Sequence, residues 1–500
     1  MSPAHLSPAH PPYRPGRATD VRLPPHPGPH PAVVLRTPYD RRSHRAELSA
    51  WAARGFAAVA QDVRGRYAAG GAWHPYRDEE SDGAATLAWI RAQEWSDGRV
   101  VAVGSSYAAY CALAVALGED PAARPDAVIA AVPALGLAET ARERTGPERL
   151  LSRAGWWAAH GDRPESGPAP LDPGRLEHLP VHTLLDLPSW PGVWEGCRRD
   201  VLLARAATAG LPLLAVGGTH DPFAEDTVRL WRRWGGPARL LLGPWGHGLT
   251  AEPAPGARRA HRVNLGELSV RWARAALSGA VSADRGGVVA LGASDVWCDA
   301  RLLVTSRGHG PVVGKVLGFG ARDGLRVVSG REFTADPWRP VRSDTLDVPR
   351  HGVPDRCLLV TPPLPRPLDL LGAADVRLDA AADTPAADWA ARLVALGPDG
   401  RAEPLAVGVV RRTGAAGEPR TFSVPLGTLA RRLPAGTRLR LEIAGHHFPA
   451  HARNPHTGED PVTATRLAAS RRTVRPSGSA LALAVAWRAR AADPAQEIPS

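Results

Sequence analysis

The sequence is strongly basic but has almost no lysine. Lys315 is the only lysine in 500 residues, so arginine supplies nearly all of the 61 basic side chains behind the formal net charge of +11. Acidic residues are interspersed among the arginines, and no basic run of the kind that follows a phosphate backbone is present. We therefore expect no nucleic-acid partner, and we attribute the arginine usage to a compositional bias of the genome.

Cysteine is scarce as well. The four cysteines, at positions 111, 197, 298 and 357, lie far apart and form no C-x-x-C pair. A zinc site or a redox motif needs closely spaced thiols, so neither is indicated. We expect reduced structural thiols and no metal.

Long apolar runs are also absent. The longest, residues 110–117 and 128–137, are too short to cross a bilayer. The first thirty residues are rich in proline and histidine and lack the apolar core of a signal peptide. The sequence thus predicts a cytoplasmic protein with no membrane partner.

The apolar residues that are present indicate several domains, because 500 residues exceed what one core supports. Short apolar runs at 32–36, 56–61, 100–104 and 127–132 alternate with helical patterns, which predicts a parallel sheet covered by helices on both faces. Residues 133–205 show helical patterns and proline-rich turns only. Strand patterns return at 212–217 and 239–243, and residues 265–277 follow as an amphipathic helix.

Beyond about residue 286 the pattern changes to short β-rich runs, such as residues 288–292, separated by Gly, Pro or Asp about every ten residues. That spacing predicts an antiparallel sandwich or jelly roll. We therefore predict an α/β core from residues 1–132 and 206–282, an inserted helical cap at 133–205 and a C-terminal β domain at 283–500.

Residues 99–117 carry the main chemical motif. A short apolar strand leads into Gly104, Ser105, Ser106 and Tyr107, and a run of helix formers follows. This order is typical of a nucleophile elbow, in which a tight strand-to-helix turn exposes one serine. We predict Ser106 as the nucleophile, because the elbow exposes the residue two positions after the glycine; Ser105 is its neighbouring rival.

Two later motifs supply partners for that serine. Asp221 lies in GGTHD after a predicted strand, and His247 lies in GPWGH after the next one. Ser, Asp and His then follow the chain order of an α/β-hydrolase triad, in which the imidazole takes the hydroxyl proton and the carboxylate orients the imidazole. The alternatives are Asp226 as the acid and His220 or His261 as the base.

Acyl transfer also needs two hydrogen-bond donors for the oxyanion. The backbone N–H of Tyr107, directly after the nucleophile, is one candidate. The loop after strand 32–36 has no glycine cluster to supply the second, so we predict the phenol of Tyr39; packing over the sheet edge is the alternative role of that ring.

These motifs resemble those of the cocaine-esterase and X-Pro dipeptidyl-peptidase family of α/β-hydrolases, also called CocE/NonD hydrolases. The matching segments are TPYDRR at 37–42, GSSYAAY at 104–110, GGTHD at 217–221, GPWGH at 243–247 and HHFPAHARNPHTGED at 446–460. The resemblance implies an α/β-hydrolase core, a helical cap and a C-terminal jelly-roll domain of the galactose-binding-like type. It also implies a triad of Ser106, Asp221 and His247, oxyanion donors at Tyr39 and Tyr107, ester or amide substrates and no cofactor.

The cap segment has no clear match to the family, so its pocket residues are predicted from composition. Trp156, Trp157 and Trp194 are candidates for an apolar acyl site, with buried packing as the alternative.

We expect a serine esterase or acylase that acts on a small or medium acyl substrate. An X-Pro dipeptidyl-peptidase-type aminopeptidase is the first alternative, and it requires a cap carboxylate to bind the free amine of the substrate. The cap acids that could do so are Glu139, Glu143, Glu148, Asp162 and Glu165. A catalytically silent binding module on the same fold is the second alternative, and a homodimer is compatible with all three.

Overall fold

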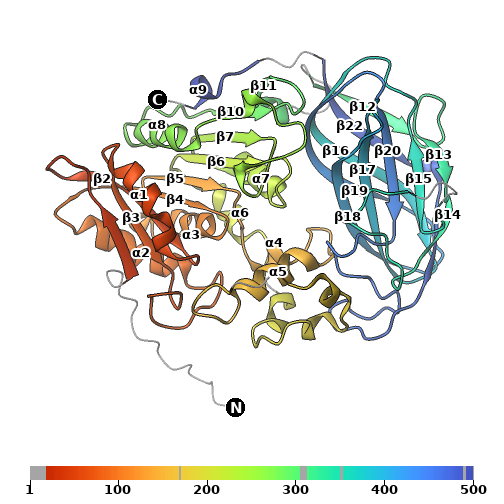
Figure 1. Cartoon of the computed structure of the whole chain (residues 1–500), viewed down its shortest axis with the longest axis horizontal. Coiled ribbons are helices and arrows are strands. Elements are labelled where there is room, and N and C mark those ends of the chain that lie inside the picture. Colours follow the sequence, from red (N-terminus) through yellow and green to blue (C-terminus); the bar gives the residue numbers. More distant parts are fainter. Residues whose placement is uncertain are drawn as a thin grey trace.

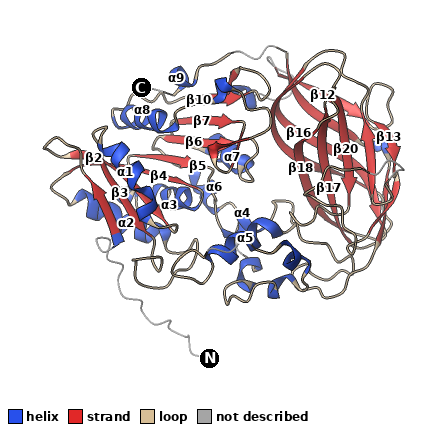
Figure 2. Cartoon of the chain, viewed as in Figure 1, coloured by secondary structure: helices blue, strands red, loops and turns tan. Residues whose placement is uncertain are grey.

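The computed structural model describes residues 18–167, 171–196, 198–304, 312–348, 353–487 and 491–498. An α/β part and an all-β part lie side by side, and a helical segment that contains α4 and α5 lies along the lower side of both (Figure 1). Strands occur in both parts, whereas most of the helices accompany the α/β part (Figure 2).

The α/β part is built on a nine-stranded sheet with the order β1-β3-β2-β4-β5-β6-β7-β10-β11. Its strands from β3 to β10 pair in parallel, and β1 and β11 pair antiparallel at the two edges. The strands are β1 (Thr19–Arg22), β2 (His30–Thr37), β3 (Ala57–Asp62), β4 (Ser96–Ser105), β5 (Ala127–Ala131), β6 (Leu213–Gly218), β7 (Ala238–Gly243), β10 (Arg285–Ala290) and β11 (Trp297–Asp299). The predicted parallel α/β core is confirmed, and the carboxyl ends of its strands meet at one edge.

One strand prediction is wrong. Residues 288–292, expected in the all-β part, lie mostly in β10, which pairs in parallel with β7. A short, continuous apolar run fits a buried parallel strand and a sandwich strand equally well, so the pattern alone could not separate them. The first sheet therefore extends past residue 282, and the other predicted domain limits stay predictions.

Helices cover both faces of this sheet. The helices are α1 (Arg45–Ala52), α2 (Glu79–Arg91), α3 (Tyr107–Ala116), α6 (Val201–Ala206), α7 (Ala224–Arg233) and α8 (Leu265–Leu277). Buried side chains of α2, α3, α6 and α7 share one apolar cluster with the strands, and those of α1 and α8 share the cluster on the other face. Helix α8 has the predicted bounds, and Asn264 caps its first turn by accepting from the N–H of Glu267 at 3.0 Å.

In its described residues, the segment between β5 and β6 consists of short helices joined by turns and irregular chain, with no named strand. It contains α4 (Leu137–Ala141), α5 (Leu150–His160), α6 and three 3-10 turns at Pro173–Glu177, Val181–Thr183 and Pro191–Trp194. Apolar side chains of α4, α5 and the three turns gather in one buried cluster that also includes Phe448, Ala452 and Val462 of the all-β part. The helical segment thus packs directly against the C-terminal part.

The all-β part is an antiparallel sandwich of two sheets. The first sheet holds β12 (Val312–Gly318), β14 (Glu332–Ala335), β16 (Leu368–Ala382), β19 (Arg420–Leu433), β21 (Ser470–Val474) and β22 (Ala480–Ala486). The second holds β13 (Arg326–Ser329), β15 (Arg356–Val360), β17 (Ala386–Leu396), β18 (Ala402–Thr413) and β20 (Arg438–Ala444). Side chains from both sheets share one apolar core, which confirms the predicted all-β domain.

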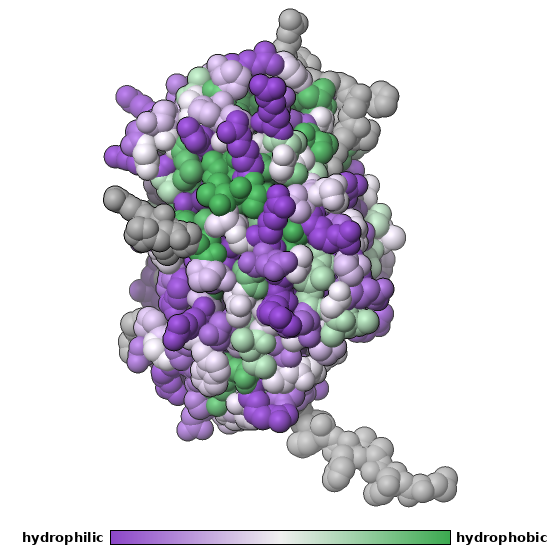
Figure 3. Space-filling view, turned by 90° about the vertical axis from the view of Figure 1, so that its right-hand side faces the viewer, coloured by the Kyte–Doolittle hydropathy of each residue, from purple (hydrophilic) through white to green (hydrophobic). Residues whose placement is uncertain are grey.

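The outer face of the sandwich is a mixture of hydrophilic and hydrophobic residues, with an apolar area in its upper half (Figure 3). Large apolar side chains exposed on the strands of the sandwich include Val316 on β12 and Val328 on β13.

Among the described residues, no helix combines the length and apolar character that a membrane crossing requires. Cys111, Cys298 and Cys357 are buried free thiols, and Cys197 lies outside the described residues.

A buried ion-pair network joins the helical segment to the sandwich. Arg411 of β18 donates to both carboxylate oxygens of Glu148, at 2.8 and 2.7 Å, and to both of Asp388 on β17, at 2.8 and 2.9 Å. Both carboxylates are buried. Each would be costly to bury without the guanidinium, because an ionised group loses its hydration in the interior.

Replacement of that arginine tests the importance of the network. We expect Arg411→Met to destabilise the protein by about 3 kcal/mol or more and to lower the apparent Tm by at least about 5 °C, measured by circular dichroism. Arg401→Met is the matched control, because Arg401 lies in the β17–β18 turn and its side chain is 89% exposed. Equal Tm values for the two variants would contradict the stabilising role of the buried network.

Candidate active site

The turn between β4 and α3 holds Ser106 in an unusual backbone conformation. Ser106 has φ 58° and ψ −121°, and its N–H donates to the carbonyl oxygen of Ala131 at 2.9 Å. Residues other than glycine rarely adopt a positive φ. Gly104 explains why the turn is so tight, since a Cβ at that position would lie 2.2 Å from the backbone carbon of Ala108. The backbones of β4 and α3 can therefore approach this closely only because residue 104 is a glycine.

Asp221 and His247 meet at the same sheet edge. Asp221 follows β6, and His247 lies in the turn of a hairpin formed by β8 (Trp245–Gly246) and β9 (Leu249–Pro253). The His247 Nδ1 lies 2.7 Å from the Asp221 Oδ1, and the Phe223 and His247 rings pack at nearly a right angle with their centroids 5.5 Å apart. The Asp221 side chain is fully buried, whereas that of His247 is 40% exposed. A buried carboxylate that accepts from Nδ1 leaves Nε2 as the nitrogen that can accept a proton.

Ser106 and His247 line one cavity of about 500 Å³. Within the described chain their side chains form no hydrogen bond with each other, although both border this cavity. Hydrogen bonds of a reactive centre are often long before substrate is bound. The structure thus brings Asp221 and His247 into contact and places Ser106 and His247 on a common cavity.

Tyr39 extends from the loop after β2 into the same cavity. Trp156 of α5 donates its Nε1–H to the phenol oxygen at 3.0 Å. Burial raises the pKa of Tyr39 to about 12, and hydrogen bonding with Trp156 and Ser106 opposes part of that rise. The phenol therefore stays protonated at neutral pH and can donate a hydrogen bond beside Ser106.

Tyr107 is the first residue of α3, so its backbone N–H belongs to the first turn, whose donors have no acceptor inside the helix. Its side chain points away to a buried site, where the phenol donates to the Glu79 Oε1 at 2.8 Å and accepts from the N–H of Tyr76 at 2.7 Å. Burial raises the pKa of Glu79, and the nearby Arg36 opposes that shift. Two hydrogen bonds thus hold the residue that follows Ser106.

The alternative site residues lie elsewhere, with one exception. Ser105 also lines the cavity and is exposed, so the structure does not turn it away from the site. Asp226 pairs with Arg229 at 3.2 Å, and burial raises its pKa to about 6. His220 Nδ1 lies 3.0 Å from the Thr219 hydroxyl, and His261 packs on Trp297 with ring centroids 5.6 Å apart.

Only one of the three predicted pocket tryptophans lines this cavity. Trp156 does so, whereas Trp157 and Trp194 are buried in the apolar cluster of the helical segment. Trp157 donates its Nε1–H to the Ser189 hydroxyl at 2.7 Å, and Trp194 packs edge-on against Trp190 at 5.1 Å. The prediction of Trp157 and Trp194 as pocket residues is wrong, because packing within the cap and against the sandwich takes both side chains.

Several residues at the cavity were not predicted. His160 lies one helical turn after Trp156 on α5. The centroid of its ring lies 5.1 Å from that of Tyr39 and 5.2 Å from that of Trp156. Burial lowers the pKa of His160 to about 4. The i to i+4 spacing on one helix face could have indicated this pair. His44 and Glu47 also line the cavity, and the His44 Nδ1 lies 2.9 Å from the Glu47 Oε2.

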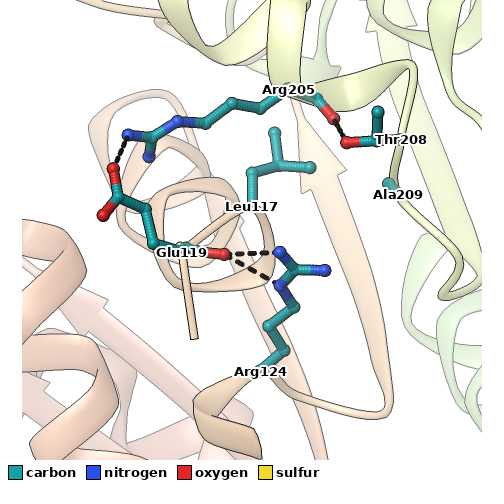
Figure 4. A pocket seen from close by; sticks show the side chains of 7 residues that line it. Leu117, Glu119, Arg124, Arg205, Thr208 and Ala209 are labelled. Atoms are coloured by element: carbon teal, nitrogen blue, oxygen red, sulfur yellow. Dashed lines mark hydrogen bonds and ion pairs between the residues drawn. The ribbon is translucent and has the colours of Figure 1, made fainter. Parts of the chain in front are cut away.

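Two other features of the described residues concern possible sites besides the cavity at Ser106. In the described residues, no group of three His, Cys, Asp or Glu side chains is arranged to hold a metal ion. A smaller cavity lies at the opposite end of α3 from Ser106, between Leu117 and α6 (Figure 4). Its polar groups pair with one another: Arg124 donates to the carbonyl oxygen of Gly118, and Arg205 pairs with Glu119.

Comparisons with known proteins agree with this fold. Residues 18–249 match the family model of X-Pro dipeptidyl-peptidase (S15 family), and residues 315–482 match that of the X-Pro dipeptidyl-peptidase C-terminal non-catalytic domain. The cocaine esterase of Rhodococcus sp. (strain MB1 Bresler) is 26% identical over 542 aligned positions, which cover 88% of this chain and 90% of that protein. The predicted family resemblance is thereby confirmed.

Two solved structures share the fold at low sequence identity. An aminopeptidase from the marine sediment archaeon Thaumarchaeota archaeon has a TM-score of 0.74 and 17% identity, and the match covers 97% of this chain and 99% of that one. An α-amino acid ester hydrolase has a TM-score of 0.74 and 19% identity, with 93% and 94% covered.

The environment of Tyr39 has a spectroscopic consequence. We expect the absorbance at 295 nm of the wild type and of Tyr39→Phe to coincide up to about pH 10.5, because a phenol with a pKa of about 12 is still protonated there. Circular dichroism at each pH shows whether the fold persists. A difference spectrum that develops near pH 10 in folded protein would show that burial does not raise the pKa of Tyr39.

Proposed function

We propose that this chain, an S15-family hydrolase related to cocaine esterase and X-Pro dipeptidyl-peptidase, is a serine esterase that cleaves small or medium acyl esters through an acyl-enzyme on Ser106. One observation supports this above all others. The buried Asp221 holds His247 at 2.7 Å on the cavity that also exposes Ser106 at a strained turn.

In the first half-reaction, the Ser106 hydroxyl attacks the ester carbonyl carbon while His247 Nε2 takes the hydroxyl proton. Asp221 keeps Nδ1 protonated and stabilises the imidazolium that forms. The tetrahedral intermediate then collapses, its bond to the leaving oxygen breaks, and His247 returns the proton to that oxygen. An alcohol leaves, and the acyl group stays bonded to Ser106.

In the second half-reaction, water replaces the alcohol. His247 takes a proton from the water as the oxygen attacks the acyl carbon, and Ser106 recovers its proton when the carboxylic acid departs. In both halves the carbonyl oxygen becomes negative, and the Tyr39 phenol and the Tyr107 N–H are our proposed donors to it. Each such donor is typically worth a factor of about 100 to 1,000 in kcat.

The carboxylates of the helical segment favour an ester over a substrate with a free amine. Glu143 pairs with Arg149 at 2.9 Å, and Glu148 pairs with Arg142 at 2.8 Å as well as with Arg411. Glu139 accepts from the N–H of Asp200, Asp162 accepts from the N–H of Ser189, and Glu165 is exposed and is not among the residues that line the cavity. Of the described carboxylates, only Glu47 lines the cavity, and it belongs to α1, outside the cap.

A fluorophosphonate probe tests the nucleophile. We expect the wild type to be labelled on Ser106, Ser106→Ala to lose the label, and His247→Ala to be labelled at least about 100-fold more slowly, because the hydroxyl then lacks its base. Mapping of the modified peptide by mass spectrometry is the measurement, and Ser105→Ala is the matched control that keeps the label. Labelling of Ser106→Ala with retained ester turnover would refute the assignment, and an unlabelled wild type would favour a silent binding module.

A pair of chromogenic substrates tests the substrate class. We expect kcat/KM for p-nitrophenyl butyrate to exceed that for Ala-Pro-p-nitroanilide by at least about 100-fold, because no unpaired cap carboxylate faces the cavity to bind the amine. The reverse preference would favour the dipeptidyl-peptidase alternative.

A further inference from the structure

The cavity at Ser106 continues below the sheet edge, between the sheet and the helices α1 and α8. Its floor consists of Leu35, Val103, Ile129 and Val216, the last large apolar side chains of β2, β4, β5 and β6 on that face. Each of the four is 4–5% exposed, whereas the residues two positions earlier on the same strands are 0–2% exposed. The empty space thus reaches the outermost layer of this face and stops there.

Small side chains create the space. Ser105, Ala131 and Ser269 border the cavity at places where larger apolar residues fill the rest of this cluster. Helix α8 begins with Leu265 at the carboxyl edge of the sheet, because it leads from the end of β7 back to the start of β10. Ser269 lies one turn deeper along that helix, beside the floor.

None of the titratable side chains that line the cavity belongs to its floor. His44 and Glu47 flank the start of α1, which follows the carboxyl end of β2, and they pair with each other. His160 and His247 also line the cavity, near Tyr39 and Asp221 respectively. The floor itself carries no charged side chain, so it suits an apolar group and offers no cation to a carboxylate.

We propose that this closed apolar part of the cavity binds the acyl chain of an aliphatic monocarboxylic ester while the chain is bonded to Ser106. The inference rests on the proposed function and adds the substrate class to it. The floor suits the acyl group better than the alcohol for a kinetic reason. The alcohol leaves first, and an alcohol seated on the floor would be trapped behind the acyl group.

A series of p-nitrophenyl esters tests the inference on the full-length protein. We expect kcat/KM of the wild type to rise by at least about tenfold from the acetate to the octanoate, since each methylene gains apolar contact on the floor. We expect Ser269→Phe, whose ring fills the space beside the floor, to lower the octanoate-to-acetate ratio by at least about tenfold.

Ser278→Phe is the matched control. It makes the same change on an exposed serine that caps the end of α8, away from the cavity lining, and we expect it to keep the wild-type ratio. Fluorophosphonate labelling of each variant reports a folded site. If Ser269→Phe does not fold, Leu265→Trp narrows the same wall from the first turn of α8 and is expected to lower the same ratio.

The outcomes separate the two proposals. If the wild type takes the label but shows no preference for the octanoate, the acyl-pocket assignment is overturned and the esterase proposal still stands. The same holds if labelled Ser269→Phe loses kcat/KM equally for the acetate and the octanoate. A selective loss on acetates of bulky alcohols, such as 2-naphthyl acetate, would reassign the floor to the leaving group. A wild type that neither takes the label nor hydrolyses any ester would overturn both proposals.

Discussion

The close approach of β4 and α3 is the constraint on which the site depends. At Gly104 the strand and helix backbones leave no room for a Cβ, and two residues later Ser106 must adopt a positive φ. Such strain persists only where the surrounding structure compensates for it. Here the compensation comes from the hydrogen bond between the Ser106 N–H and the neighbouring strand β5, and from the buried, almost wholly apolar helix that follows. The turn brings Ser106 to the cavity at the sheet edge that Tyr39 and His247 also line, and Asp221 contacts His247 there.

Polar groups of the site are held mainly by partners from other elements. Tyr107 is fixed through Glu79 of α2, and Tyr39 receives a hydrogen bond from Trp156 of the helical segment. The helical segment is in turn held against the sandwich by the ion pairs of Arg411 and by the apolar cluster that includes Phe448. The C-terminal domain can therefore influence the site without lining it, because it fixes the position of the helix that contacts Tyr39.

The arginine-rich composition has a structural counterpart in these pairs. Arginine presents a planar set of donors that matches carboxylates at two positions, which suits buried pairs such as Arg411 with Glu148. Arg149 similarly binds both oxygens of Glu143 and also donates to the carbonyl oxygen of Pro222, beside Asp221. In such places the arginines pair with carboxylates and carbonyl oxygens inside the protein, which agrees with the absence of a basic run in the sequence.

The sequence by itself determined the parallel core, the elbow at Ser106 and the two loops that bring Asp221 and His247 together, because those features follow from local patterns and chain order. It did not determine where β10 pairs, since a short apolar run fits either sheet. Nor could it separate Trp156 from Trp157. Adjacent residues on a helix point about 100° apart, so only one of them can face the cavity. The tertiary structure decided which one, because the orientation of α5 depends on packing against the sandwich from residues some 300 positions later in the chain.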